Sequence, residues 1–250
     1  MITVYTCITD QYDQLLKQPS FKDVNYVCFC DVDREIKKDG WNLKPLISPP
    51  SLTDSSLINR YHKLLCYNFN NTSKFSIYID GNVLLQENPN NFTSQFEENN
   101  LIIGAFRHEL RKDVSSEIDA CLASNMFNDT EIKELQSFYN ETILDGFNND
   151  NGLSANYILV RRQQNTLLNK AMQDWWLIVK NRVKRDQLSL QFVLWKNLIP
   201  WIELNGFIIP KKFFSRFPHG KYSLFLPLKI QSFIKKVIIK LSLIKSKKVN

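Results

Sequence analysis

The sequence predicts an α/β domain of three layers around a central, mostly parallel (mixed) sheet. Strand-like segments rich in β-branched and aromatic residues dominate the first third of the chain, and strands and helices alternate after it. Of the 250 residues, 44% are apolar, which is enough for a substantial core. In open sheets of this kind ligands bind beyond the carboxyl ends of strands, and polar residues follow three predicted strands, at positions 9–13, 31 and 80–82.

In the first half of the chain, runs of β-branched and aromatic residues predict strands. These strands are expected at residues 2–9, 25–31, 74–80 (with a continuation at 83–85) and 101–106. A short helical stretch is expected around Leu15, and residues 33–56 are expected to be irregular because glycine and several prolines interrupt them. Helical spacing predicts a helix over residues 56–69, with Leu57 and Leu64 on one side.

The second half of the chain predicts helices, one further strand and polar loops. The helices are expected at residues 114–125, 128–143, 164–180 and 186–197. The second of these begins with a capping box formed by Asn128 and Glu131. A polar loop is expected at residues 146–154, a short strand at 157–160 and a basic loop at 211–222.

The charge of the chain is unevenly distributed, although the net charge is +7. No aspartate or glutamate occurs from Lys211 to Asn250, whereas the preceding residues are more acidic than basic. The sequence has no P-loop, dinucleotide-binding or nucleophile-elbow motif. The basic segment is mostly aliphatic, which argues against a nucleic-acid partner. The five cysteines lie mostly in apolar segments and predict free thiols.

We expect two parts, a domain over residues 1–222 and a basic amphipathic C-terminal helix over residues 223–250. Apolar residues of this second part recur at helical spacing, at Ile230, Phe233, Ile234, Val237, Ile238, Leu241 and Ile244. Lysines occupy much of the remainder, so we expect the helix to lie on an anionic membrane surface. The alternative is a helix that packs on its own domain or on a second copy in a homodimer.

Targeting signals are not evident in the sequence. The N-terminus has no charged region followed by an apolar one, so a secretion signal is not expected. No apolar run reaches the roughly 20 residues needed to span a bilayer. We therefore expect a cytoplasmic protein that is peripheral to the inner membrane.

The segment SIYIDGN, residues 76–82, is the most informative for chemistry. A predicted strand ends at Asp80, Gly81 permits a sharp turn, and Asn82 supplies a second oxygen. A carboxylate and an amide oxygen two positions apart can bind one hard divalent cation, which would offset the charge of a diphosphate leaving group. The alternative is an ordinary turn, because Asp-Gly and Gly-Asn are common turn dipeptides.

Two further sets of basic residues are candidates for binding phosphate or metal. Arg60 and Lys63 form a stripe on the helix predicted over residues 56–69, and they can meet phosphate oxygens if that helix packs beside the strand end. The alternative is a solvated helix face. His219 lies among basic residues and is either a metal ligand, a diphosphate donor or an uninvolved loop histidine.

The remaining candidates follow a strand or begin a helix. His108 and Arg111 come just after a predicted strand, with Glu117 further on, so they can bind an anion or a sugar hydroxyl, or form a surface loop. Asp186 and Gln187 begin a predicted helix. An aspartate there is a favourable partner of the helix dipole, and the alternative is a catalytic or acceptor-binding carboxylate.

These segments occur in an order and spacing that is similar to a known family. They are YTCITDQYD, VCFCD, RYHKL, SIYIDGN, H-x-x-R, ILVRR, WW and RDQLSL, and they run from Ile2 to Trp195. The chain resembles the TOD/MUCI-type glycosyltransferase-like family of plants and bacteria, formerly a domain of unknown function. The resemblance implies a GT-A-like fold, which binds a nucleotide-sugar donor and usually requires a divalent metal, Mn²⁺ or Mg²⁺.

The resemblance also implies roles for individual residues. Residues expected to bind the donor nucleotide or its diphosphate are Thr6, Tyr12, Asp13, Arg60, Lys63 and Asp80. Residues expected on the sugar or acceptor side are His108, Arg111, Glu117 and Gln187. The expected metal ligands are Asp80, Asn82 and His219, and Asn82 departs from the Asp-x-Asp pattern of GT-A enzymes. Asp186 is the expected catalytic carboxylate, as a general base or as an acceptor-orienting group.

The expected function is the transfer of a sugar from a nucleotide-sugar donor to a growing surface or capsular glycan, or to a lipid-linked acceptor, in polysaccharide biosynthesis at the cytoplasmic membrane face. The alternative is a catalytically silent GT-A-like scaffold that binds a glycan or a partner protein, and the departure at Asn82 favours it. A nucleotidyltransferase ranks third, because that class usually carries a glycine-rich signature near its first strand and TCITDQYD has no glycine.

Overall fold

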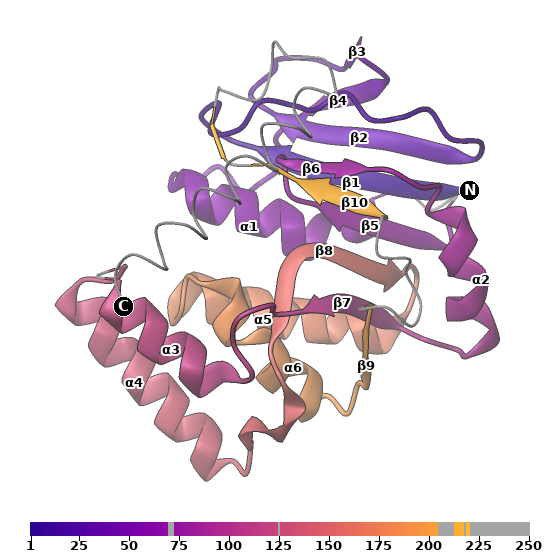
Figure 1. Ribbon diagram of the computed structural model, residues 1–250. Helices are drawn as coiled ribbons and strands as arrows, with labels where there is room; N and C mark the ends of the chain where they lie inside the picture. Colours follow the sequence, from indigo (N-terminus) through magenta and orange to yellow (C-terminus); the bar gives the residue numbers. More distant parts are fainter. Residues whose placement is uncertain (70–72, 125, 205–212, 218, 221–250) are drawn as a thin grey trace, which may run out of the picture.

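The computed structural model describes residues 1–69, 73–124, 126–204, 213–217 and 219–220, and these form a central sheet covered on both faces (Figure 1). In spatial order its strands are β3 (Ile36–Lys38), β4 (Trp41–Pro45), β2 (Val24–Cys30), β1 (Ile2–Ile8), β5 (Phe75–Ile79), β8 (Ser154–Arg162), β7 (Ile103–Arg107) and β9 (Trp201–Glu203). A separate two-stranded sheet pairs β6 (Val83–Leu85) with β10 (Phe214–Arg216).

The direction of the strands confirms the expected α/β class with a mostly parallel, mixed sheet. Strands β4, β2, β1 and β5 are parallel, as are β7 and β9, whereas β3 and β8 run antiparallel to their neighbours. Strands β1 and β5 therefore end at the same edge, at Ile8 and Ile79. The antiparallel strand β8 begins at that edge, where Ile158 faces Ile79 and Ser154 faces Arg107 at the end of β7.

Helices cover the two faces of the sheet unequally (Figure 1). They are α1 (Ser55–Leu65), α2 (Asn90–Glu98), α3 (Val114–Ala123), α4 (Asp129–Leu144), α5 (Thr166–Asn181) and α6 (Leu190–Lys196), with 3-10 turns at Cys66–Asn68, Asn149–Asn151 and Asp186–Leu188. One face packs against α1 and against α3 to α6. The other face packs against α2, β6 and the residues around β10.

Strand β1 divides the core between these faces by ordinary strand alternation. Tyr5 and Cys7 join the cluster on the helical face, whereas Val4 and Ile8 join the other cluster. All seven residues of the strand are buried, because a central strand of a parallel sheet is covered on both sides. The polar residue Thr6 is consequently enclosed as well, with no exposed surface.

Side-chain caps explain where several helices begin. Asp54 accepts two backbone N–H groups of the first turn of α1, and Asn165 accepts one at the start of α5. Asn128 and Glu131 form the capping box that the sequence predicted at the start of α4. These local signals were readable because each cap uses residues only two or three positions apart.

The structure also contains short elements that the sequence analysis did not predict, namely β3, β4, α2, β9 and β10. The segment expected to be irregular at residues 33–56 contains β3 and β4, joined at Asp39 and Gly40, which both have positive φ angles. The basic loop expected at 211–222 contains β10. Strands of three to five residues are too short to show a clear period, and tertiary pairing decides them.

Other expected elements differ in their bounds. No helix forms around Leu15. The strand expected at 157–160 is longer and spans Ser154–Arg162, so it takes in the end of the expected polar loop. The helix expected from Asp186 begins as a 3-10 turn and becomes α-helical only at Leu190.

The expected C-terminal helix and the division at residue 222 lie outside the described residues, which end at Gly220. All five cysteines are free, as expected. In the part of the chain that the structure describes, no helix combines the length and the apolar character needed to cross a bilayer.

Candidate active site

A cleft of about 1240 Å³ opens at the edge of the sheet where β1 and β5 end and β8 begins. Thr9, Asp10, Tyr12 and Asp13 after β1 and Asp80 after β5 line it, as the position of the strand ends predicted. Helix α1 supplies Arg60 and Lys63, and the 3-10 turn after α5 supplies Asp186. Chain segments far apart in sequence therefore meet in one cavity that is rich in charged side chains.

Helix α1 presents Arg60 and Lys63 to the cleft because residues three apart share a helix face. An adjoining side of the helix is anchored in the core through Leu57 and Leu64. Asn59 fixes the helix to the end of β1, since its amide donates to the carbonyl oxygen of Cys7 at 2.7 Å. The same Asn59 side chain accepts a hydrogen bond from Arg60 at 3.0 Å. Helix α1 therefore packs beside the strand ends, which is the condition under which Arg60 and Lys63 were expected to reach phosphate oxygens.

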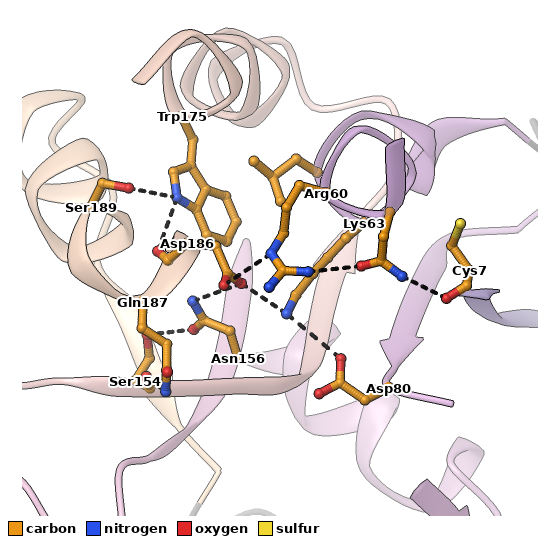
Figure 2. Close-up of polar contacts among 12 residues, drawn as sticks. Cys7, Arg60, Lys63, Asp80, Ser154, Asn156, Trp175, Asp186, Gln187 and Ser189 are labelled. Carbon is orange, nitrogen blue, oxygen red and sulfur yellow. Dashed lines mark hydrogen bonds and ion pairs between the residues drawn. The ribbon is translucent and has the colours of Figure 1, made fainter. Parts of the chain in front are cut away.

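Lys63 lies at the centre of the polar network (Figure 2). Its ammonium nitrogen is 2.8 Å from a carboxylate oxygen of Asp186 and 3.7 Å from one of Asp80. It also lies 4.9 Å from the centre of the Tyr78 ring. The side chain is only 5% exposed, and a buried cation is tolerated when it is paired in this way. Lys63 therefore connects the carboxylate at the end of β5 with the carboxylate of the 3-10 turn.

Asp186 is almost fully enclosed, and its second cationic neighbour is Arg60 at 3.4 Å. Burial by itself would raise the pKa of Asp186, but Lys63 and Arg60 outweigh it and hold the pKa well below its usual range. Asp186 is therefore held as an anion between two cations and can accept hydrogen bonds from hydroxyl groups.

Strand β8 and helix α5 hold Asp186 in place (Figure 2). The amide of Asn156 donates to the Asp186 carboxylate at 3.4 Å, and Ser154 donates to the carbonyl oxygen of the Asn156 side chain at 2.7 Å. The indole N–H of Trp175 donates to the backbone carbonyl of Asp186 at 3.2 Å. The neighbouring Gln187 reaches the carbonyl oxygen of Ser154 at 3.5 Å. Both the side chain and the backbone of Asp186 are therefore fixed from outside the turn.

The turn after β5 is bound to a second segment, residues 213–217 with 219–220, which we call the strap. Asn82 makes two bonds to it: its backbone carbonyl accepts from the N–H of Phe217 at 2.9 Å, and its amide donates to the carbonyl oxygen of Phe217 at 2.5 Å. At Gly81 a Cβ atom would lie 3.1 Å from the Cβ of Asp13, so a side chain is hard to accommodate there. The strap closes one side of the cleft with Phe217 and His219.

His219 is oriented by Asp13. The Nδ1 atom of the ring lies 3.0 Å from the Asp13 carboxylate, which also accepts the backbone N–H of Gly220 at 3.1 Å. The hydrogen bond to Asp13 raises the pKa of His219. It also places the remaining ring nitrogen, Nε2, beside Asn82, 3.4 Å from the amide nitrogen. A carboxylate that holds one ring nitrogen while the other faces a site is the usual arrangement around metal-binding histidines.

The donor atoms near the turn fit a hard divalent cation. The side-chain oxygen of Asn82 is buried and has no hydrogen-bond partner among the described residues. Asp80 supplies a carboxylate, and His219 supplies an oriented imidazole nitrogen. Considering only the described residues, no group of three or more His, Cys, Asp or Glu side chains could hold an ion. A cation at this turn would have Asp80, His219 and the amide oxygen of Asn82 as its protein ligands.

A second charged cluster lies behind another wall of the cleft and centres on Glu117 of α3. One carboxylate oxygen of Glu117 accepts from Arg185 at 2.5 and 2.8 Å, and the other is 3.0 Å from Arg111 and 3.9 Å from His108. The two arginines and the histidine line the cleft, whereas Glu117 is 1% exposed and does not. Burial lowers the pKa of His108. Glu117 therefore orients cleft-facing cations instead of contacting a ligand itself.

Residues 1–207 of the chain match the sequence model of a protein family, which is described as the TOD1/MUCI70 glycosyltransferase-like domain. The chain belongs to this family. The match covers the central sheet, α1 and the 3-10 turn of Asp186, and the strap lies beyond it. The resemblance of the motifs to the TOD/MUCI-type family is thereby confirmed, as is the expectation of a glycosyltransferase-like enzyme domain.

Three similar solved structures are distant in sequence from the glycosyltransferase-like domain. The apo form of mouse xyloside xylosyltransferase 1 has 9% identity and a TM-score of 0.46, with 90% of this chain and 99% of that chain covered. The bifunctional glycosyltransferase WbbM has 9% identity and a TM-score of 0.43, with 81% and 38% covered. The galactosyltransferase LgtC, in complex with donor and acceptor sugar analogues, has 12% identity and a TM-score of 0.40, with 82% and 73% covered. No curated protein matches the chain.

Most of the residues that the sequence singled out lie at the cleft of the glycosyltransferase-like domain. They are Tyr12, Asp13, Arg60, Lys63, Asp80, Asn82, His108, Arg111, Asp186, Gln187 and His219. Two residues do not line it. Thr6 is enclosed within the sheet because its position in β1 alternates with Tyr5 and Cys7, and Glu117 lies behind the arginines that it pairs with.

Sequence reasoning missed several residues that line this cleft, among them Arg185, Asn156 and Arg216. Arg185 directly precedes Asp186, so its place in the RDQLSL segment was a usable signal. Asn156 falls between the loop expected at 146–154 and the strand expected at 157–160, whereas it belongs to β8 and contacts Asp186. Arg216 lies 4.7 Å from the ring centre of Tyr157, in a strap whose pairing with β6 has no local sequence signal.

Replacing Glu117 by glutamine is expected to lower the free energy of unfolding by roughly 2 kcal/mol, because Arg111 and Arg185 would lose their shared anion. Urea unfolding of the variant checks this. Asp119→Asn is the matched control, since Asp119 is an exposed residue of the same helix. Equal stability of the two variants would show that Glu117 does not hold the arginines.

Proposed function

We propose that the cleft binds a nucleotide-sugar donor and that the domain transfers its sugar to a glycan acceptor. The observation that carries this proposal is the position of Lys63, whose ammonium is held between the carboxylates of Asp80 and Asp186. In the proposal the diphosphate binds near Asp80 at the end of β5, and the sugar binds near Asp186. Lys63 marks the boundary between the two parts of the site.

The chemical task of the site is to stabilise the nucleoside diphosphate as it leaves. Negative charge develops on the leaving oxygen in the transition state, and fixed donors that face this oxygen lower the barrier. An ammonium has three N–H donors; Asp186 lies within hydrogen-bond distance of it at 2.8 Å, whereas Asp80 at 3.7 Å is near enough only for an ion pair. Donors therefore remain for the leaving oxygen, and Lys63 is the residue that we assign to this role.

A divalent cation, Mn²⁺ or Mg²⁺, is part of the proposal, with Asp80, Asn82 and His219 as its ligands. When bound, such a cation neutralises the diphosphate and assists its departure. Lys63 and Arg60 are already paired with Asp186, so they neutralise little of the charge of a diphosphate. This supports the need for a divalent cation. Asp13 orients His219 toward the same place, so we assign Asp13 to the support of the metal site.

The role proposed for Asp186 is to accept a hydrogen bond from a hydroxyl group of the donor sugar or of the acceptor. Its lowered pKa and its two cationic neighbours support this role over that of a general base. His108 and Arg111 lie on the same cleft, with Leu110 between them, 82% exposed. We assign this wall to the acceptor, and the apolar Leu110 suits the less polar face of a sugar or the lipid of a lipid-linked acceptor.

The acceptor that we propose is a growing surface or capsular glycan, reached at the cytoplasmic face of the inner membrane. The support is the basic amphipathic pattern of residues 223–250, which lie outside the described residues. Binding of the full chain to vesicles with and without anionic lipid tests this part of the proposal separately from the chemistry.

Isothermal titration calorimetry with UDP and GDP, each with and without Mn²⁺, tests the donor site. We expect at least one nucleotide to bind to the full chain, more tightly with the metal, and we expect Lys63→Met to weaken this binding by about a factor of ten or more. A wild-type protein that binds neither nucleotide would contradict the proposal.

The second candidate function is a catalytically silent scaffold that binds a glycan or a partner protein. The observation that favours it is Asn82, whose amide is engaged in holding the strap where GT-A enzymes usually have a second carboxylate. A screen of nucleotide sugars for donor hydrolysis separates the candidates, because a scaffold releases no nucleoside diphosphate from any donor.

A further inference from the structure

Arg161 of β8 is a buried cation that the proposed chemistry does not use. The residue has no exposed surface, and among the described residues no carboxylate lies within ion-pairing distance of it. Burying an unpaired guanidinium is costly unless other groups compensate for the lost water. The contacts of Arg161 therefore call for an explanation.

The guanidinium of Arg161 is directed at the end of helix α1. It donates to the carbonyl oxygen of Lys63 at 2.8 Å and to that of Leu64 at 3.3 Å. It also donates to the hydroxyl of Tyr5, which in turn donates to the same Lys63 carbonyl at 2.8 Å. The ring of Tyr67 lies 4.6 Å from the guanidinium carbon. Two side chains thus converge on one backbone carbonyl, that of Lys63.

The physical reason for this arrangement is the carboxyl end of the helix. The last four carbonyl groups of an α-helix have no partner within it and carry the negative end of the helix dipole. Helix α1 ends at Leu65, so the carbonyl groups of Lys63 and Leu64 belong to this set. These two carbonyl groups compensate the charge of Arg161, which has no carboxylate partner among the described residues. The Tyr67 ring adds a cation–π contact.

The same residue, Lys63, extends its side chain into the cleft. Its backbone is held by Arg161 and Tyr5 on one side, and its ammonium lies between Asp80 and Asp186 on the other. Strand β8 supports both ends of this arrangement, because it carries Arg161 and also carries Asn156, which bonds to Asp186. A shift of α1 along its axis would move the ammonium relative to both carboxylates.

We propose that Arg161, with Tyr5, is a positioning residue that fixes the position of α1 along its axis. It thereby holds the Lys63 ammonium between the carboxylates of Asp80 and Asp186, and it does not contact a ligand itself. The assignment of Lys63 to the leaving group rests on the proposed function. The placement of Lys63 by Arg161 is a statement about the protein alone and is tested separately.

The chain offers a matched control in the next residue. Arg162 points to the other side of β8, where it donates to the carbonyl oxygens of Phe96 at 2.9 Å and Leu101 at 3.0 Å, and it lies 5.1 Å from the ring centre of Phe75. It therefore supports backbone carbonyls near the end of α2 in much the same way, but it has no connection to the cleft. Arg161→Met and Arg162→Met each remove the donors to two backbone carbonyls, from opposite faces of one strand, although Arg162 is less buried than Arg161.

The first readout is the chemical accessibility of Lys63. The full-length variants are treated briefly with acetic anhydride, and acetylation of each lysine is measured by peptide mass spectrometry relative to the exposed Lys17. Lys63 is 5% exposed and is expected to react slowly in the wild type. We expect its reaction to increase by about a factor of ten in Arg161→Met and to stay at the wild-type value in Arg162→Met. Because Arg161 is fully enclosed and Arg162 only partly buried, the free energy of unfolding of both variants is measured too, and only an increase in acetylation beyond that expected from global unfolding supports the proposal.

A milder pair of variants covers the case in which Arg161→Met does not fold. Tyr5→Phe removes one of the two donors to the Lys63 carbonyl, and its control is Tyr26→Phe, whose hydroxyl donates to the carbonyl oxygen of Pro19 at 2.9 Å. We expect a smaller increase in Lys63 acetylation for Tyr5→Phe and none for Tyr26→Phe.

The second readout is the affinity for UDP and GDP, measured by calorimetry with Mn²⁺ present. We expect it to fall in Arg161→Met and in Tyr5→Phe but not in their controls. Equal Lys63 acetylation in each variant and its control would overturn the positioning role and leave Arg161 as a purely structural cap. If the wild type binds neither nucleotide, the proposed function fails, and the acetylation result still decides the placement of Lys63.

Discussion

Asp80→Asn is expected to lower the rate of donor turnover by about three orders of magnitude while the domain remains folded. The substitution removes the carboxylate assigned to the cation and leaves Lys63 paired with Asp186 alone. The fold is expected to survive because the backbone N–H of residue 80 still donates to the carbonyl oxygen of Tyr157, at 2.9 Å. Release of nucleoside diphosphate from the preferred donor measures the rate, and circular dichroism checks the fold.

Asp31→Asn is the control for this prediction. Asp31 follows the neighbouring strand β2 and accepts the N–H of Asp10 at 3.0 Å, but it does not line the cleft. We expect its variant to turn over donor at close to the wild-type rate. If Asp80→Asn also kept that rate, the carboxylate at the end of β5 would have no part in the chemistry.

Asp186→Ala is expected to lower the free energy of unfolding by about 3 to 5 kcal/mol, because it leaves Lys63 without its nearest anion in a buried place and deprives Arg60 of the same partner. Activity is expected to be lost as well. Chemical denaturation monitored by tryptophan fluorescence measures the change, and Trp175, which bonds to the backbone of residue 186, reports on this region.

The effect of Asp186 on stability is also expected to depend on pH. The pKa of Asp186 is lowered in the folded protein, so its contribution is fully present above the unfolded-state pKa of about 4 and is lost as the pH falls below that value. The wild type is therefore expected to lose more stability than Asp186→Ala when the pH is lowered from about 5 to about 2. If the free energy of unfolding of the two proteins fell equally over this pH range, the ion pairs of Asp186 with Lys63 and Arg60 would not stabilise the fold.

Asp174→Ala is the control for Asp186→Ala. Asp174 pairs with Lys170 at 2.8 Å on the exposed side of α5, and an exposed pair of this kind contributes about 0.5 kcal/mol. A loss as large as that of Asp186→Ala would mean that burial is not what makes Asp186 important.

The long elements of the fold could be predicted because their signals are local. The period of the apolar residues placed α5, and Asn128 with Glu131 marked the start of α4. Strand β10 could not be predicted, because its three residues pair with β6 across more than half the chain. The α-helix expected to begin at Asp186 begins only at Leu190. A 3-10 turn precedes it, in which Lys63 and Arg60 hold the carboxylate of Asp186.

The candidate site was predictable where residues follow strand ends. Asp80 and the residues after β1 meet because parallel strands finish at one edge of the sheet. The supports of the site were not predictable, because Arg161 and Asn156 act from the interior of β8. Thr6 does not line the cleft, because it lies within β1, where every residue, including both threonines, is buried.

The strap has a consequence for the order in which the protein is made. Asn82 bonds to Phe217 across 135 positions, and Asp13 bonds to His219 across 206. A ribosome must therefore synthesise the chain as far as the strap before either bond can form, and until then the edge of β6 lacks its partner in the two-stranded sheet. An unfinished or C-terminally truncated polypeptide would expose this edge to other chains, so co-translational protection by a chaperone would help it most at that stage.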